Sequence, residues 1–259
     1  VKDPQRFTPV MSMLVQELQA LVDRGEQPPQ DASRFNLALD SVRTLRPTIE
    51  LWRAHRQELT DPWVGPGARR HKQMIQEITD DLIDQWIDRD DGDGKGTVEF
   101  IQEFARPLPQ RVTARVLGFP LEDVDQLAAW GAAQVMQYVY GKGHLNQLSE
   151  EETALQAGRL DGFADYLADQ VARKRQNPQD DMISALTQIH YTALERKLTD
   201  EEVYGIVYFM VLGGLETTQY ALEEEAQLLC DQPDLFAAIR AKPDKIRAFT
   251  EEAMRLRAP

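Results

Sequence analysis

Apolar residues along the chain recur mainly at spacings of three and four, which is the period of an amphipathic α-helix. This spacing predicts helices over residues 8–23, 67–89, 97–117, 121–137, 150–175 and 180–193. Strand-like alternation is scarce, and short clusters of Gly, Pro and Asp separate the helical segments. We therefore expect a mainly α protein, with residues 1–259 folded as a single domain.

The most sharply defined helix begins at Thr199. Thr199 and Glu202 have the spacing of a capping box, in which each side chain bonds a free backbone amide of the other. The helix is predicted to run to about residue 229, which makes it roughly 45 Å long at the usual rise per residue. Residues 204–212 are apolar around the whole helix, so we expect this middle part to be buried on every face.

The hexapeptide Gly213-Gly-Leu-Glu-Thr-Thr218 follows this apolar stretch and is a poor choice for packing alone. Each glycine costs about 1 kcal/mol relative to alanine inside a helix. A carboxylate in apolar surroundings is also costly unless it is paired or protonated, and threonines that bond to the preceding turn bend helices. One interpretation is a kinked helix with a ligand groove, where Thr217 donates a hydrogen bond and Glu216 relays protons. The alternative is close helix packing at Gly213 and Gly214, with Glu216 reaching solvent.

Composition narrows the possible functions. The net charge of −14 argues against a nucleic-acid partner, and no apolar run is long enough to span a membrane. The single cysteine, Cys230, excludes an internal disulfide and favours a cytoplasmic location. The basic clusters 69–72 and 173–175 are interpreted as solvated helix faces, with a docking patch for an acidic protein as the alternative.

Metal chemistry finds little support in the residues. The four histidines lack the spacing of a zinc site. Residues 88–99 are similar to a calcium-binding loop, but Gly92 and Asp93 stand in the reverse of the required order. We therefore expect an acidic turn there and no metal ligand within the chain.

Three motifs in the correct order resemble those of cytochromes P450. The hexapeptide at 213–218 resembles their long central helix. Glu252-Ala-Met-Arg255 resembles their Glu-x-x-Arg helix, and Trp52-Arg-Ala-His-Arg56 resembles the helix that meets the haem propionates. Segments 3–7, 98–120 and 177–184 resemble further parts of the family. The chain is thus identified as similar to an internal portion of a bacterial-type soluble P450, truncated at both ends.

This resemblance implies a P450 fold, haem b and a monooxygenase that uses dioxygen on a small organic substrate. It implies that Gly213 and Gly214 lie beside the bound oxygen and that Glu216 and Thr217 deliver protons. Electrons would come from NAD(P)H through a ferredoxin or a flavoprotein reductase. The family's propionate-binding positions correspond to Trp52, His55 and Arg56, and its structural ion pair corresponds to Glu252 and Arg255.

One departure from the family concerns the cysteine thiolate that binds the haem iron. Cys230 lacks the surrounding glycine-containing loop, so we interpret it as an ordinary, semi-buried thiol. The alternative function is therefore a non-catalytic, P450-derived helical binding or scaffold protein.

Overall fold

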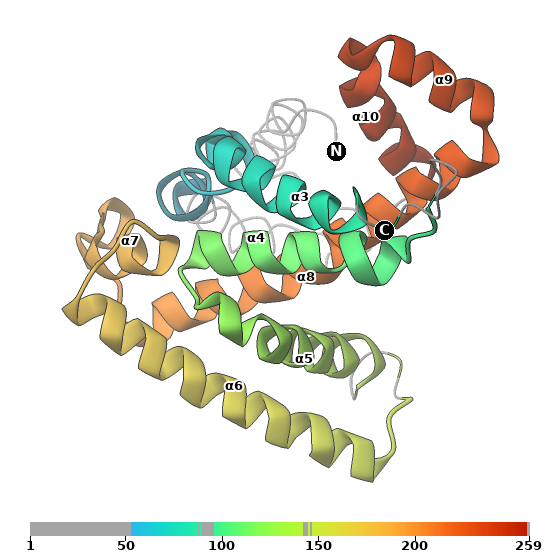
Figure 1. The fold of residues 1–259 in the computed structure, drawn as a ribbon. Coiled ribbons are helices and arrows are strands. Elements are labelled where there is room, and N and C mark those ends of the chain that lie inside the picture. The colour runs from blue at the N-terminus through green and yellow to red at the C-terminus, as the bar shows by residue number, and fades with distance from the viewer. Residues whose placement is uncertain (1–52, 88, 90–95, 142–144, 146, 258–259) are drawn as a thin grey trace, which may run out of the picture. The chain divides into compact units, whose positions relative to one another are not determined.

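The structure is a computed structural model that describes residues 53–87, 89, 96–141, 145 and 147–257 (Figure 1). The predicted helix at 8–23, Trp52 and most of the acidic segment 88–99 lie outside these residues. Residues 1–62 and 63–259 form two compact units, and each is described by itself. The expectation of a single domain stays a prediction.

The described part of the first unit is a short helical segment. Residues Arg56–Thr60 form the π-helical turn η1, and Leu59 within it is buried. Arg56 donates a hydrogen bond to Asp61 through its Nη2 atom, over 3.0 Å.

The second unit is almost entirely helical. Its α-helices are α3 (Lys72–Ile87), α4 (Pro107–Leu117), α5 (Val124–Val135), α6 (Glu150–Gln176), α7 (Met182–Gln188), α8 (Asp200–Asp231), α9 (Pro233–Ala241) and α10 (Ile246–Leu256). The shorter turns are η2 (Gly65–His71), η3 (Ile101–Ala105), η4 (Leu121–Asp123), η5 (Met136–Tyr140), η6 (Thr192–Leu194) and η7 (Pro243–Lys245). The two-residue strands β1 (His190–Tyr191) and β2 (Arg196–Lys197) pair antiparallel.

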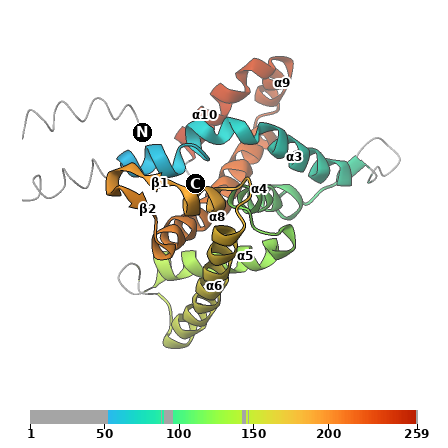
Figure 2. The same cartoon turned by 90° about the vertical axis from the view of Figure 1, so that its left-hand side faces the viewer.

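Helix α8 is the element around which the second unit packs. It contacts α4, α5, α6, α7 and α10. Figure 1 shows it passing behind α4, and Figure 2 shows the two helices side by side. The contact is made by a stripe with a period of four residues, which are Val203, Val207, Val211 and Leu215. This period keeps the stripe on one side of the helix.

The prediction for this helix is confirmed in its bounds and its start. The Thr199 hydroxyl accepts a hydrogen bond from the Glu202 amide at 3.3 Å, and the Glu202 carboxylate accepts one from the Thr199 amide at 2.8 Å. Helix α8 is continuous from Asp200 to Asp231, and the kink stays a prediction.

Burial on every face of α8 was a wrong expectation. Phe209, in the middle of the apolar stretch, is 64% exposed, because the helices of the described residues pack on the valine stripe. The apolar stretch of α8 therefore covers two surfaces of the helix, one buried in the core and one exposed.

Two other helix predictions need correction. The segment 180–193 is helical only to Gln188, after which Ile189 is extended and the β1–β2 hairpin begins. The segment 97–117 divides into η3 and α4, since Pro107 lacks an amide proton and begins a new helix.

The interpretation of residues 173–175 as a solvated face holds for the exposed Arg173 and is wrong for Lys174 and Arg175. Lys174 is only 8% exposed and pairs with Asp181, which caps α7 by accepting a hydrogen bond from the Ser184 amide at 2.7 Å. Arg175 donates to Asp200 at 2.6 Å. These cations join the end of α6 to the starts of α7 and α8. Among the described residues, no helix is long and apolar enough to cross a membrane.

Candidate functional site

The two adjacent glycines of α8 face different surroundings. A Cβ atom on Gly214 would lie 2.8 Å from Oγ1 of Thr113 on α4, a distance that packed atoms do not tolerate. Thr113 also donates a hydrogen bond to the Gly214 carbonyl over 3.2 Å. A Cβ atom on Gly213 would meet no described atom within 4 Å. Close packing therefore explains Gly214 and leaves Gly213 on an open surface.

Thr217 lies on the open side of α8 with Gly213. Its hydroxyl donates a hydrogen bond of 2.7 Å to the Gly213 carbonyl, one helical turn earlier. Phe209, Gly213 and Thr217 follow one another at intervals of four, and all three are exposed. Because the Thr217 oxygen keeps its acceptor lone pairs, it can accept a hydrogen bond from a ligand on this surface.

Thr218 belongs to the other side of the helix. Together with Gly214 and Met210 it lines an apolar pocket of about 280 Å³ among α3, α4 and α8. The two neighbouring threonines therefore face different environments. The hexapeptide therefore does not form one groove. Gly213 and Thr217 lie on the open surface of α8, whereas Gly214 and Thr218 line the apolar pocket.

Glu216 is half-buried, and the structure records no ion pair between it and another described residue. Burial raises the pKa of its carboxyl group, and the positive charge of Arg106 partly opposes this rise. Tyr220 lies one turn further along α8, where the negative charge of Glu216 raises the pKa of the Tyr220 phenol. The carboxyl group is therefore protonated at higher pH than an ordinary glutamate, which suits a proton donor.

The expected propionate-binding residues fall in the first unit. His55 is half-buried beside η1, and Arg56 is exposed and hydrogen-bonded to Asp61. Trp52 lies outside the described residues. The role of these three residues stays a prediction.

Glu252 and Arg255 form the predicted pair on α10. The Arg255 Nε and Nη2 atoms donate to the Glu252 carboxylate over 2.7 and 2.6 Å. The side chains are 65% exposed for Arg255 and 54% exposed for Glu252. Within the described part of the chain, the pair thus lies at the surface.

Cys230 is exposed, which corrects the expectation of a semi-buried thiol. It lies on α8, roughly 25 Å along the helix axis from Gly213 at the usual rise per residue. A thiol at that distance cannot bind the iron of a group that lies against Gly213.

Sequence reasoning missed three neighbours of the site. Tyr220 could have been found, because residues four apart share a helix face. Arg106 and Thr113 come from the start and middle of the α4 region, far from α8 in sequence. Only the packing of η3 and α4 against α8 brings them to the hexapeptide.

Comparison with known proteins gives one consistent answer. The chain is 29% identical over 185 residues to the polyketide biosynthesis cytochrome P450 PksS of Bacillus subtilis, covering 71% of this chain and 41% of that protein. It is 26% identical over 191 residues to the mycinamicin IV hydroxylase/epoxidase of Micromonospora griseorubida, covering 73% of this chain and 44% of that protein. No protein-family model matches the chain.

Solved structures agree with these relatives. The ligand-free structure of cytochrome P450 TbtJ1 aligns with a TM-score of 0.67 at 26% identity, covering 80% of this chain and 51% of that one. The structure of P450BioI with a fatty-acid-ligated acyl carrier protein aligns with the same TM-score and identity, covering 80% of this chain and 50% of that one. The chain therefore has the mainly α fold of the cytochromes P450 and is similar to the bacterial members of that family. It spans about two fifths of the length of the curated relatives that it matches.

Proposed function

We propose that this chain forms the α8 wall of a haem-dependent monooxygenase, which inserts one oxygen atom from dioxygen into a small organic substrate. The observation that carries the proposal is the open surface of α8. There the Thr217 hydroxyl donates to the Gly213 carbonyl, and Glu216, whose carboxyl group has a raised pKa, immediately precedes Thr217. Electrons would come from NAD(P)H through a ferredoxin or a flavoprotein reductase.

The open surface fits one side of a planar cofactor. At Gly213 a flat group can approach the backbone closely, because no Cβ projects and no described side chain covers the position. The thiolate ligand expected on the other side of the cofactor is not supplied by Cys230. This residue is the chain's single cysteine, and it lies too far from Gly213 to bind the iron. When haem is bound in this family, it supplies the oxygen chemistry.

The roles of the chain's own residues follow from their chemistry. Thr217 would hold a hydrogen-bonded ligand in place and transfer protons on the open side of α8. Glu216 would supply those protons, because burial keeps its carboxyl group protonated at higher pH. Trp52, His55 and Arg56 are proposed to bind the propionates. Glu252 and Arg255 are proposed to have a structural role.

A pair of threonine variants tests the role of Thr217. In the holoenzyme with a surrogate ferredoxin and reductase, Thr217→Ala should release more hydrogen peroxide for each NADPH consumed and still bind haem. Thr218→Ala removes a neighbouring hydroxyl that lines the apolar pocket instead of the open surface, and it should behave like wild type. Equal peroxide yields in Thr217→Ala and wild type would remove Thr217 from the mechanism.

A second candidate is a P450-derived helical binding or scaffold protein without haem. Cys230 does not decide between the two candidates, because it lies too far from Gly213 to bind the iron in either case. A stably folded, colourless protein would support this candidate, and stoichiometric haem would exclude it.

A further inference from the structure

Gln134 of α5 is a buried polar residue at the contact with α8. It is only 1% exposed, and its Nε2 atom donates a hydrogen bond to the Tyr208 carbonyl of α8 over 3.0 Å. Its Oε1 atom is also buried and has no hydrogen-bond partner among the described residues. A buried polar atom without a partner destabilises a fold, and an apolar side chain of similar size avoids that cost. Packing of α5 against α8 therefore does not explain a glutamine at this position.

Thr113 of α4 is a second polar residue that packing does not explain. Its hydroxyl donates a hydrogen bond to the Gly214 carbonyl of α8 over 3.2 Å. It lies in the wall of the apolar pocket among α3, α4 and α8, where the other lining residues of α4 are Leu108, Pro109, Val112, Val116 and Leu117. Valine has the shape of threonine and would place no hydroxyl group in these apolar surroundings. The use of this hydroxyl that the structure shows is its bond to α8.

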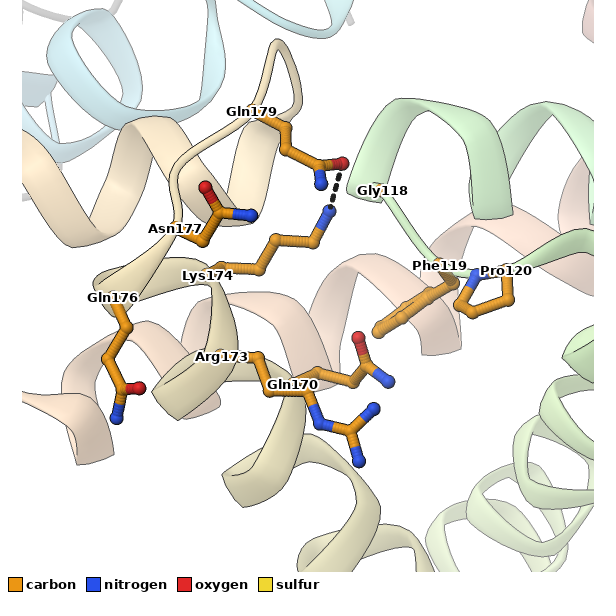
Figure 3. A pocket seen from close by; sticks show the side chains of 9 residues that line it. All are labelled: Gly118, Phe119, Pro120, Gln170, Arg173, Lys174, Gln176, Asn177 and Gln179. Atoms are coloured by element: carbon orange, nitrogen blue, oxygen red, sulfur yellow. Dashed lines mark hydrogen bonds between the residues drawn. The ribbon is translucent and has the colours of Figure 1, made fainter.

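Polar residues at the open pocket at the end of α6 have ordinary explanations (Figure 3). There Lys174 donates a hydrogen bond to Gln179 over 3.4 Å. Gln176 and Asn177 are exposed to solvent. The two bonds to α8 differ from these, because they end on backbone carbonyls in the middle of a helix, where the backbone already supplies a donor.

The carbonyls of Tyr208 and Gly214 lie on the two sides of Gly213 in sequence, and the Gly213 carbonyl accepts the Thr217 hydroxyl over 2.7 Å. In a continuous α-helix, each of these carbonyls also accepts the amide four residues later. A carbonyl oxygen has two lone pairs and can accept both donors. The second donor draws the carbonyl away from the helix axis and lengthens its backbone bond, which bends the helix.

We propose that Gln134 and Thr113 are positioning residues, which hold the α8 backbone before and after Gly213 and so set the place of Gly213 and Thr217 on the open surface. The two donors come from different helices, α5 and α4, and both act from the packed side of α8. Their effect on catalysis rests on the proposed monooxygenase function. Their effect on the backbone rests on the hydrogen bonds alone.

The backbone effect of Gln134 is tested by NMR on the ¹⁵N-labelled full chain. Gln134→Leu removes the second donor at the Tyr208 carbonyl, so the Leu212 amide should bond to it more closely. Its amide proton should move downfield and exchange with solvent several-fold more slowly than in wild type. Gln126→Leu makes the same change on the exposed face of α5 and should leave the Leu212 amide unchanged.

Thr113→Val tests the second bond in the same way. It should move the Thr218 amide proton downfield and slow its exchange several-fold, because the amide of Thr218 shares the Gly214 carbonyl. Thr113→Ser keeps the hydroxyl and should retain the wild-type shift. Unchanged shifts in Gln134→Leu and Thr113→Val would overturn the proposal. Faster exchange with a lower midpoint of thermal unfolding would also overturn it, because both residues would then only stabilise the packing.

The effect on catalysis is measured in the holoenzyme with a surrogate ferredoxin and reductase. Gln134→Leu and Thr113→Val should release more hydrogen peroxide for each NADPH consumed than wild type, at equal haem content. Wild-type peroxide yields in both variants would overturn the positioning role. A wild-type chain that binds no haem would contradict the proposed function alone, since the amide shifts would still decide whether these residues position α8.

Discussion

Two regions of the molecule differ in how their polar side chains are paired: the junction of α6 with α7, and the middle of α8. At the junction, the buried Lys174 and Asp181 are paired with each other, and Asp181 also receives the Ser184 amide. In the middle of α8, Glu216 is half-buried without an ion pair to a described residue, and the Thr217 hydroxyl donates to the Gly213 carbonyl of its own helix. The first arrangement stabilises a helix junction.

The second arrangement leaves polar groups available to a ligand. Several features that lower local stability lie within one hexapeptide, namely two glycines, an unpaired acid and a back-bonded threonine. Functional sites typically concentrate such features, because residues there are selected for function even where they destabilise the local helix. The contrast separates residues that hold the fold from residues that serve the site.

The largest effect is expected at the junction. Lys174→Met should lower the free energy of unfolding by roughly 3–5 kcal/mol, because it leaves the buried Asp181 carboxylate without its counter-charge. Urea denaturation measures the change, and Lys72→Met on the exposed start of α3 is the matched control. A loss no larger than that of the control would mean that the junction does not depend on this pair.

The two glycines should respond in opposite directions. Gly214→Val should destabilise the chain by roughly 1–3 kcal/mol, since its side chain would collide with Thr113. Gly213→Ala should instead stabilise it by about 1 kcal/mol, because alanine favours the helix and its Cβ meets open space. Both changes are measured by urea denaturation. Destabilisation by Gly213→Ala would show that this side of α8 is packed.

The smallest effect is expected from Glu216, and it depends on pH. Burial raises the pKa of this carboxyl group above its ordinary value of 4.5, so the folded chain binds the proton more tightly than the unfolded chain. The stability contributed by this proton is present below pH 4.5 and is lost as the pH rises through the folded pKa. Glu216→Gln should therefore match wild type in acid and exceed it at neutral pH in urea denaturation.

Glu252→Gln serves as the control with the opposite sign. Hydrogen bonds from Arg255 lower the pKa of Glu252, so its contribution is present above pH 4.5 and is lost as the pH falls through the folded pKa. The Glu252→Gln variant should be less stable than wild type at neutral pH. The same pH dependence in both variants would contradict the burial argument for Glu216.

Sequence alone predicted the elements whose signals are local. Helix α8 was predicted within two residues at its end, because Thr199 and Glu202 mark its start and the apolar period marks its course. The face that α8 exposes could not be predicted, since its apolar stretch contains both the buried valines and the exposed Phe209. Side-chain pattern alone does not say which helices will cover a surface.

Contacts between segments that are distant in sequence could not be predicted from the residue pattern of a single helix either. The hexapeptide indicated a site, but the different surroundings of Gly213 and Gly214 depend on Thr113, about a hundred residues away in sequence. The basic run 173–175 resembled a solvated face because its partners, Asp181 and Asp200, follow only after the helix ends. Such pairs form when helices pack, and spacing within one helix does not reveal them.

The most direct test of the central claim is the absorption spectrum of the protein purified from the cells that produce it, reduced and exposed to carbon monoxide. Our account predicts stoichiometric haem, and a strongly red-shifted Soret band would show that the iron has a thiolate ligand other than Cys230. A folded protein without haem would contradict the monooxygenase proposal and favour the scaffold alternative.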